Sequence, residues 1–292
     1  MLIDRDSSIL VTGGAGFIGS HLCEYLLCKG YKHIVSLDDY SSGTKNNHID
    51  GVTYISGSTS KIFSLIDFIP DVIFHLGEYS RVEQSFEDFD KVCESNHQGT
   101  LNVAKFAIKT GAKLIYAGSS TKFSDKNSGR FQTPYGWSKA SNSEFIVNLG
   151  DWFGLKYAIT YFYNVYGDRE ISSGSYATVI AIYREAMQRN TPLKVVLPGV
   201  QVRNFTHVSD IVEGLYLVAL YGEGDEYGIG HNREWRIQEV AELFGGEIEH
   251  VPERRGNRLS GMLVTQKTRE LGWSPKVELE EYVNQLRESG WS

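Results

Sequence analysis

The sequence has few cysteines and no excess of basic side chains, and both shortages exclude whole classes of protein. Its 292 residues include three cysteines, Cys23, Cys28 and Cys93, whose spacing matches no metal site, so we expect reduced thiols and no metal centre. Lysine and arginine total 29 against 36 acidic residues, which gives a net charge of −7, and no basic block occurs. Nucleic acid is therefore not expected as a partner.

Long apolar segments are also missing. No run reaches the roughly 18 apolar residues that a membrane span needs, so no contact with a membrane is expected. The segment Met1–Asp6 has neither an apolar signal core nor a cleavage site, which favours a cytoplasmic protein. A length of 292 residues and a hydrophobic fraction of 41% suffice for one large domain or two modest ones.

A glycine-rich segment near the start is the most informative feature that is present. Gly13, Gly16 and Gly19 are three residues apart, between the apolar run 9–11 and a helical pattern that begins near Phe17. A strand, a tight glycine turn and a helix N-terminus form the arrangement that binds a dinucleotide pyrophosphate. Alone, the pattern also fits an ordinary strand-to-helix turn.

An acidic residue supports the dinucleotide interpretation. Asp38 ends the next apolar run, about 20 residues after the last glycine, where an acid contacts the adenosine ribose. A carboxylate there accepts hydrogen bonds from the ribose hydroxyls and repels a 2′-phosphate, so NAD is favoured over NADP.

Short apolar runs alternate with amphipathic segments along the first half of the chain. Strands are predicted at 8–12, 33–38, 52–56, 72–76, 113–118 and 157–163, and helices at about 17–29, 61–68, 96–110 and 135–153. This alternation predicts an α/β fold with a doubly wound parallel sheet, whose ligands lie at the carboxyl ends of the strands. The remainder predicts helices at about 176–190, 210–221, 236–244 and 278–288 and strands at 193–197 and 227–230, which we expect to contribute a smaller lobe.

A tyrosine and a lysine four residues apart, Tyr135 and Lys139, share one face of a predicted helix. A neighbouring ammonium and a positively charged nicotinamide favour the phenolate form of a tyrosine, which can then remove a proton from a substrate hydroxyl. The same spacing also fits a surface tyrosine beside a solvated lysine. The glycine turn and a predicted strand ending in Ser119 and Ser120 favour the catalytic interpretation.

Taken together, the motifs resemble those of the extended short-chain dehydrogenase/reductases, specifically the nucleotide-sugar epimerase/dehydratase family with its Rossmann fold. The matching segments cover nearly the whole chain: 12–20, 37–43, 75–76, 96–102, 117–120, 134–139, 163–167, 203–210, 254–256 and 271–273.

The resemblance implies a role for each matched position. Ser120, Tyr135 and Lys139 are the implied catalytic residues, with Ser120 sharing the proton at the sugar O4. The implied NAD contacts are Gly13, Gly16, Phe17, Ile18, Gly19, Asp38, Ser58, Leu76, Tyr135 and Lys139. The implied contacts of the nucleoside-diphosphate sugar are Ser120, Tyr135, Asn164, Arg203 and Arg254. Arginine pairs well with a doubly anionic diphosphate, although Arg254, with Arg255 beside it, also fits ordinary surface charge.

Several positions depart from the family pattern. Thr121 and Lys122 replace the Asp-Glu pair of the 4,6-dehydratases, which argues against dehydration. The segment 57–59, Gly-Ser-Thr, lacks the usual acid near adenine. Glu78 and Arg81 replace small residues; they either face a ligand or pair with each other. His75 is expected to pack at a strand end, and Asn96 is either a helix cap or part of a polar network.

The resemblance implies NAD-dependent oxidoreduction at C4 of a nucleoside-diphosphate sugar, most simply by a 4-epimerase. The alternatives are a C4 dehydrogenase that stops at the 4-keto sugar, a 4,6-dehydratase, which the sequence disfavours, and a non-catalytic NAD-binding regulator. The expected division assigns residues 1–165 plus about 203–232 to the NAD-binding domain and 166–202 plus 233–292 to a nucleotide-sugar-binding lobe.

A homodimer is expected from the helices at about 96–110 and 135–153. Their apolar side chains exceed what one sheet face needs, and relatives pair these helices into a four-helix bundle across a two-fold axis. The side chains in question are Leu101, Val103, Ala104, Ala107, Ile108, Phe145, Ile146, Leu149 and Trp152. The competing interpretation is that they are buried inside one monomer.

Overall fold

A computed structural model of the chain describes residues 4–123, 133–172, 177–252 and 261–291. Its centre is a seven-stranded parallel sheet in the order β11-β6-β5-β4-β1-β2-β3. The strands are β1 (Ser8–Thr12), β2 (His33–Asp38), β3 (Thr53–Ser56), β4 (Val72–His75), β5 (Lys113–Ser119), β6 (Tyr157–Phe162) and β11 (Gly224–Ile229). The strand order reverses between β1 and β4, so the predicted doubly wound sheet is confirmed.

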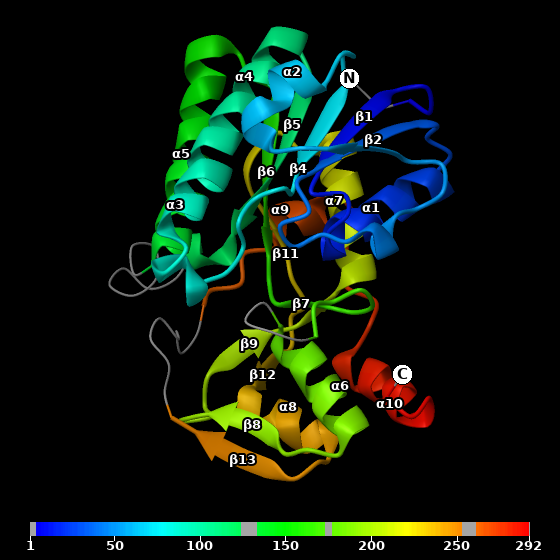
Figure 1. The fold of residues 1–292 in the computed structure, drawn as a ribbon, viewed down its shortest axis with the longest axis vertical. Helices are drawn as coiled ribbons and strands as arrows, with labels where there is room; N and C mark the ends of the chain where they lie inside the picture. Colours follow the sequence, from blue (N-terminus) through cyan, green and yellow to red (C-terminus); the bar gives the residue numbers. More distant parts are fainter. Residues whose placement is uncertain (1–3, 124–132, 173–176, 253–260, 292) are drawn as a thin grey trace.

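Helices cover both faces of this sheet (Figure 1). One face carries α1 (Phe17–Cys28), α7 (Val208–Tyr221) and α9 (Gln266–Glu270), and the other carries α2 (Ile62–Leu65), α4 (Thr100–Thr110) and α5 (Pro134–Phe153). Successive strand side chains point to opposite faces, so Leu10 packs in the core beside α4 and α5 while Val11 packs in the core beside α1 and α7. Because both faces are covered, the central strands β1 and β4 are largely buried and apolar, whereas the edge strands β3 and β11 carry polar residues and are partly exposed.

A smaller lobe lies below the carboxyl ends of the large sheet in Figure 1 and has its own core around Tyr183, Trp235 and Phe244. Its elements are α6 (Val179–Arg189), β8 (Leu193–Val196), β9 (Val202–Asn204), β12 (Glu234–Arg236), α8 (Ile237–Phe244), β13 (Ile248–Val251) and α10 (Leu279–Glu288). Strands β8 and β13 pair in parallel, and β9 and β12 pair antiparallel. Two further short strands, β7 (Val165–Tyr166) and β10 (Thr206–His207), pair in parallel. Strand β7 comes directly after β6 in the chain, and β10 comes directly before α7.

Most predicted elements lie within a few residues of the observed ones, and two helices differ. The helix predicted at 61–68 ends at Leu65, because Ile66 adopts extended backbone and turns into the core. The helix predicted at 96–110 begins earlier, as α3 (Phe89–Val92), and continues through a π-helical stretch, Cys93–Gly99, into α4. The two- to four-residue strands β7, β9, β10, β12 and β13 carry too little periodicity to be predicted.

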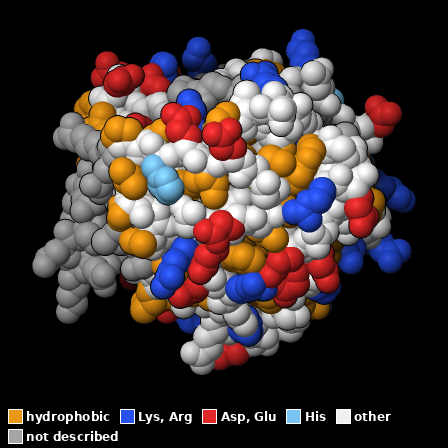
Figure 2. Space-filling model, turned by 90° about the horizontal axis from the view of Figure 1, so that it is seen from below, with side chains coloured by type: hydrophobic (Ala, Val, Ile, Leu, Met, Phe, Trp, Pro, Cys, Tyr) orange, Lys and Arg blue, Asp and Glu red, His pale blue; other side chains and the backbone are white. Residues whose placement is uncertain are grey.

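Figure 2 shows the end of the molecule formed by the smaller lobe. Acidic and basic side chains are interspersed there with hydrophobic ones, so the described part of this face carries no extended patch of one sign. Within the described ranges, none of the helices has the length and apolar character needed to cross a bilayer.

Candidate active site

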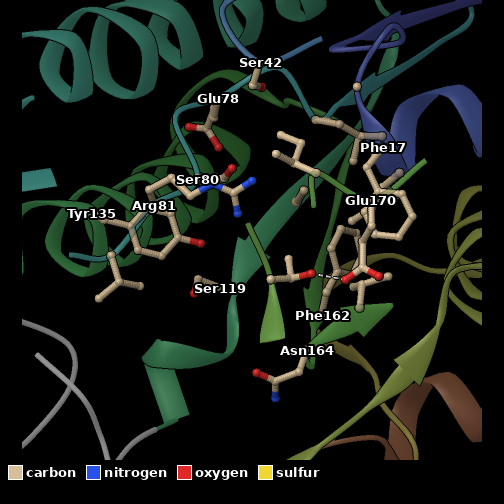
Figure 3. Close-up of a pocket in the computed structure, with 18 of the residues that line it drawn as sticks. Phe17, Ser42, Glu78, Ser80, Arg81, Ser119, Tyr135, Phe162, Asn164 and Glu170 are labelled. Carbon is tan, nitrogen blue, oxygen red and sulfur yellow. Dashed lines mark hydrogen bonds between the residues drawn. The ribbon is translucent and has the colours of Figure 1, made fainter. Parts of the chain in front are cut away.

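A cavity of about 740 Å³ lies at the carboxyl ends of the sheet strands, with the smaller lobe as its far wall. It brings together nearly all of the predicted site residues: Gly13, Gly16, Phe17, Ile18, Gly19, Asp38, Leu76, Ser120, Tyr135, Lys139, Asn164 and Arg203. In the view of Figure 3, Tyr135 and Glu78 lie toward one side of this cavity and Phe17 and Glu170 toward the other. Arg254 lies outside the described residues.

The glycine turn between β1 and α1 is closed tightly against the segment after β4. Gly13 has a positive φ of 74°, and a Cβ there would lie 2.8 Å from the Cα atom of Gly77. Helix α1 is capped by Gly16, with no side-chain hydrogen bond to its first turn. The free N–H groups at the start of α1, and the glycines of the turn, which have no side chains, leave room for a pyrophosphate and provide hydrogen-bond donors to it.

Asp38 lies at the end of β2 and is 6% exposed. Its carboxylate accepts hydrogen bonds from the backbone N–H groups of Ala15 (2.9 Å) and Tyr40 (2.8 Å). Burial raises the pKa of this carboxyl, and the two N–H groups oppose that rise. Asp38 therefore ties the turn of β2 to the glycine turn and presents a carboxylate in the same cavity, as ribose recognition requires.

Ser58 is the exception among the predicted cofactor contacts within the described ranges. Its neighbours Gly57 and Thr59 line the cavity, whereas Ser58 does not. The Ser58 hydroxyl instead accepts a hydrogen bond from the backbone N–H of Ser60 (3.2 Å) and caps the 3₁₀ turn Thr59–Lys61.

The three predicted catalytic residues line one part of the cavity. Ser120 follows the end of β5, and Tyr135 and Lys139 lie in the first two turns of α5. The Lys139 ammonium donates to the carbonyl oxygen of Ala117 (2.8 Å) and pairs with the carboxylate of Glu78. The sequence left two alternatives for Glu78: it faces a ligand, or it pairs with Arg81. In the structure, Glu78 lines the cavity, and its carboxylate pairs with Lys139.

His75 and Asn96 have structural positions. The His75 ring lies between the hydroxyls of Thr12 (2.7 Å) and Thr100 (2.9 Å), and burial lowers the pKa of its imidazole to about 4. It is a packed, uncharged strand-end residue, as expected. The Asn96 amide donates to Ser138 (2.9 Å), so it is a member of the polar network behind the cavity and not a helix cap.

Two of the predicted sugar-nucleotide contacts face the cavity from neighbouring segments. Asn164, with a positive φ of 39°, follows β6, and its amide donates to the carbonyl oxygen of Asn204 (3.1 Å). Arg203 precedes Asn204 in β9 and lines the cavity. The hydrogen bond between the two asparagines holds the smaller lobe's edge against the end of β6.

Lys122 is turned away from the cavity. Its ammonium pairs with Asp225 of β11 and donates to the phenol oxygen of Tyr161 (2.9 Å). The cavity wall at this point is formed by Thr121, whose hydroxyl donates to Ser119 (3.0 Å). The positions that hold an acidic pair in dehydratases thus present a hydroxyl to the cavity and a lysine to the opposite side.

Sequence reasoning missed a buried acidic residue in the cavity wall, Glu170. Glu170, three residues after Gly167, is 7% exposed and lines the cavity. Its carboxylate accepts hydrogen bonds from the Thr178 hydroxyl and the Gly167 N–H. Burial raises the pKa of Glu170 to about 7, outweighing these hydrogen bonds and the nearby arginines. Its place next to a matched motif was the available signal.

Glu170 is predicted to make stability fall as pH rises. Its folded-state pKa exceeds that of an unfolded glutamate, so its stabilising proton is present at low pH and is lost as pH rises through about 7. Glu170→Gln should therefore raise the free energy of unfolding by roughly 2 to 3 kcal/mol more at pH 8 than at pH 5. Urea unfolding at the two pH values measures this difference, with the exposed Glu249→Gln as control; an equal effect at both would contradict it.

Among the described residues, no group of three or more His, Cys, Asp or Glu side chains is close enough together to bind one metal ion.

Comparison with known proteins gives one consistent picture. The sequence profile of the NAD dependent epimerase/dehydratase family matches residues 9–230. A putative UDP-glucose 4-epimerase of Methanocaldococcus jannaschii is 29% identical over 297 residues, 95% of this chain and 96% of that protein. A UDP-N-acetyl-alpha-D-glucosaminuronate decarboxylase of Bacillus cytotoxicus is 33% identical over 270 residues, 83% of each chain.

A solved structure agrees with these relatives. The crystal structure of UDP-glucose 4-epimerase from Thermotoga maritima, determined with UDP-glucose, superposes with a TM-score of 0.87 and 30% identity. The superposition covers 97% of this chain and 99% of that one.

Proposed function

Because the chain belongs to the NAD dependent epimerase/dehydratase family, we propose that it is a nucleotide-sugar 4-epimerase that uses NAD. The observation that carries the proposal is one cavity lined by the glycine turn, Asp38, Ser120, Tyr135 and Lys139. Relatives named UDP-glucose 4-epimerase that span nearly the whole chain support it.

Binding of the cofactor follows from the residues at the sheet edge. The first-turn N–H groups of α1 would bind the pyrophosphate, and Asp38 would accept hydrogen bonds from the adenosine ribose. Lys139 would hold the nicotinamide ribose. In this assignment, residues 1–165 plus about 203–232 form the NAD-binding part, and residues 166–202 plus 233–292 form the nucleotide-sugar-binding part. The structure differs from this division at two elements: β9, whose Arg203 would face the sugar diphosphate, pairs with β12 in the smaller lobe, and α9 packs against the large sheet.

The proton chemistry belongs to Tyr135. Its phenolate removes the proton of the sugar O4, and the Ser120 hydroxyl shares that proton. Lys139 lies one helical turn after Tyr135 on the same face of α5. When bound, NAD would supply reversible hydride acceptance at C4. Epimerisation would then require the 4-keto sugar to rotate in the cavity, so that its opposite face is reduced.

Dehydration of the sugar is disfavoured by the wall beside Ser120. Elimination of water across C5 and C6 needs an acid and a base at those carbons. Thr121 supplies only a hydroxyl there, and Lys122 is held by Asp225 away from the cavity.

A panel of UDP-, GDP-, CDP- and dTDP-sugars tests the proposal, with product stereochemistry read by NMR and NADH read by absorbance. We expect a C4 epimer without accumulation of NADH. Accumulated NADH with a 4-keto product identifies a dehydrogenase, and bound NAD without turnover of any sugar identifies a regulator; either result contradicts the epimerase.

We also propose that two chains pair through α4 and α5. Five of the nine apolar side chains expected there are buried within the monomer, so the interface expected from the sequence was too large. Aromatic side chains remain exposed along α5, namely Trp137 (39%), Trp152 (63%) and Phe153 (63%). Exposed aromatics on one helix support an isologous interface.

Light scattering at micromolar concentration is expected to give the mass of a dimer. Trp152→Glu should shift the protein toward monomer, because a charge would replace an apolar contact at the two-fold interface. Ile69→Glu, at a side chain that is 72% exposed outside these helices, is the matched control. Monomer alone for the wild-type protein would contradict the pairing.

A further inference from the structure

Glu78 is a buried carboxylate that the proposed mechanism does not use. Its side chain is 1% exposed at the back of the cavity, in the segment after β4. One carboxylate oxygen pairs with the Lys139 ammonium. The other accepts hydrogen bonds from Thr100 (2.6 Å), Asn142 (3.0 Å) and Tyr116 (3.2 Å).

This cradle comes from separate elements of the fold. Tyr116 lies in β5, Thr100 begins α4, and Asn142 lies in α5 one turn after Lys139. Four donors on one carboxylate satisfy the lone pairs that a buried charge must have satisfied. Burial alone would raise the pKa of Glu78, but the charge of Lys139 and the hydrogen bonds from Lys139 and Thr100 hold it below its usual range.

The pair also fixes Lys139. Its ammonium is held between Glu78 and the carbonyl oxygen of Ala117 (2.8 Å), and Lys139 is 5% exposed. The ammonium therefore has a defined position at the cavity wall. Its positive charge is offset by a carboxylate in direct contact with it.

We propose that Glu78 is a positioning residue that acts through Lys139 and makes this end of the cavity electrically neutral, so that the site loses the preference for reduced over oxidised nicotinamide that the Lys139 charge alone would impose. The proposal rests on the proposed function, which assigns Lys139 to the nicotinamide ribose. The ring carries one positive charge when oxidised and none when reduced. An uncompensated ammonium beside it favours the reduced form, and Glu78 removes that bias.

The test measures which cofactor the protein retains. Protein is brought to equilibrium with an excess of NAD and NADH in equal amounts and gel-filtered, and the bound cofactors are quantified. Glu78→Gln keeps the shape of the side chain and removes its charge. We expect the ratio of bound NAD to bound NADH to fall about tenfold, the scale of one unit charge at roughly 10 Å and an effective dielectric constant of about 20.

Two further variants separate charge from shape. In Glu78→Gln combined with Lys139→Met both charges are gone, and the ratio should return to within about threefold of wild type. Lys139→Met alone should leave the ratio at or above the wild-type value, which tests the charge account without altering Glu78. Glu94→Gln, at an exposed position of the π-helical stretch, is the control for loss of one carboxylate.

An unchanged ratio in Glu78→Gln would overturn the proposal, as would a ratio in the double variant that stays as low as in Glu78→Gln. A fall in Lys139→Met alone would also overturn it. Failure of the proposed function would give a different result. The wild-type protein would then bind neither NAD nor NADH, or it would convert none of the nucleotide sugars.

Discussion

Tyr135→Phe is expected to leave a folded protein with bound NAD and to slow turnover by roughly 100-fold or more, the usual scale for loss of a general base. The substitution keeps the aromatic ring in the cavity wall and removes only the oxygen that accepts the O4 proton. Initial rates on a sugar that the wild type accepts measure the loss. Far-ultraviolet circular dichroism and quantified NAD confirm that the fold and the cofactor site are intact.

The matched control is Tyr221→Phe, which removes the same oxygen from a side chain that is 55% exposed on α7. It should retain the wild-type rate. Ser120→Ala should slow turnover less than Tyr135→Phe, because the O4 proton loses one of two partners. If Tyr135→Phe stays within a few-fold of wild type, Tyr135 is not the base.

Asp38→Ala should raise the dissociation constant for NAD by about tenfold or more and narrow the preference of the protein for NAD over NADP. The change removes a charged acceptor of ribose hydroxyls, whose hydrogen bonds contribute roughly 1.5–3 kcal/mol each. It also removes the repulsion of a 2′-phosphate. Titration calorimetry with both cofactors measures the two effects.

Asp38 also accepts hydrogen bonds from Ala15 and Tyr40, so a second variant is needed to separate recognition from turn structure. The two N–H groups bind different oxygens of the carboxylate. Asp38→Asn removes the charge and keeps an acceptor oxygen for one of them. It should still narrow the preference for NAD. Asp50→Ala, at an exposed position beyond the site, should change neither constant. Equal affinity of the wild type for NAD and NADP would remove the role given to Asp38.

The cofactor-binding end of the cavity could be predicted from the sequence, because each motif that forms it lies within a short stretch of the chain. The glycine turn, the acid that ends β2 and the Tyr135–Lys139 spacing are each contained in one short segment whose backbone geometry is fixed by its own residues. Parallel strands then bring these segments to one edge. Twelve of the predicted residues accordingly line a single cavity.

Features that depend on three-dimensional proximity were not available from the sequence. The pairing of Lys139 with Glu78 joins residues 61 positions apart, and that of Lys122 with Asp225 joins residues 103 apart. The sequence also does not show which apolar residues are buried within the monomer. Val103 of α4 and Ile146 of α5 fit a dimer interface by their spacing, but they pack in the monomer core. The burial of Glu170 in the cavity wall likewise depends on the three-dimensional structure, although its place beside the motif at 163–167 was a signal in the sequence.

The fate of the hydrogen at C4 tests the central claim most directly. The wild-type protein is given a nucleotide sugar from the panel that carries deuterium at C4, and the product is analysed by NMR and mass spectrometry. An epimerase that returns the hydride it removed yields the C4 epimer with deuterium still at C4, at a rate lowered by a primary isotope effect. A product without C4 inversion, or one whose C4 deuterium has been lost, would contradict the account.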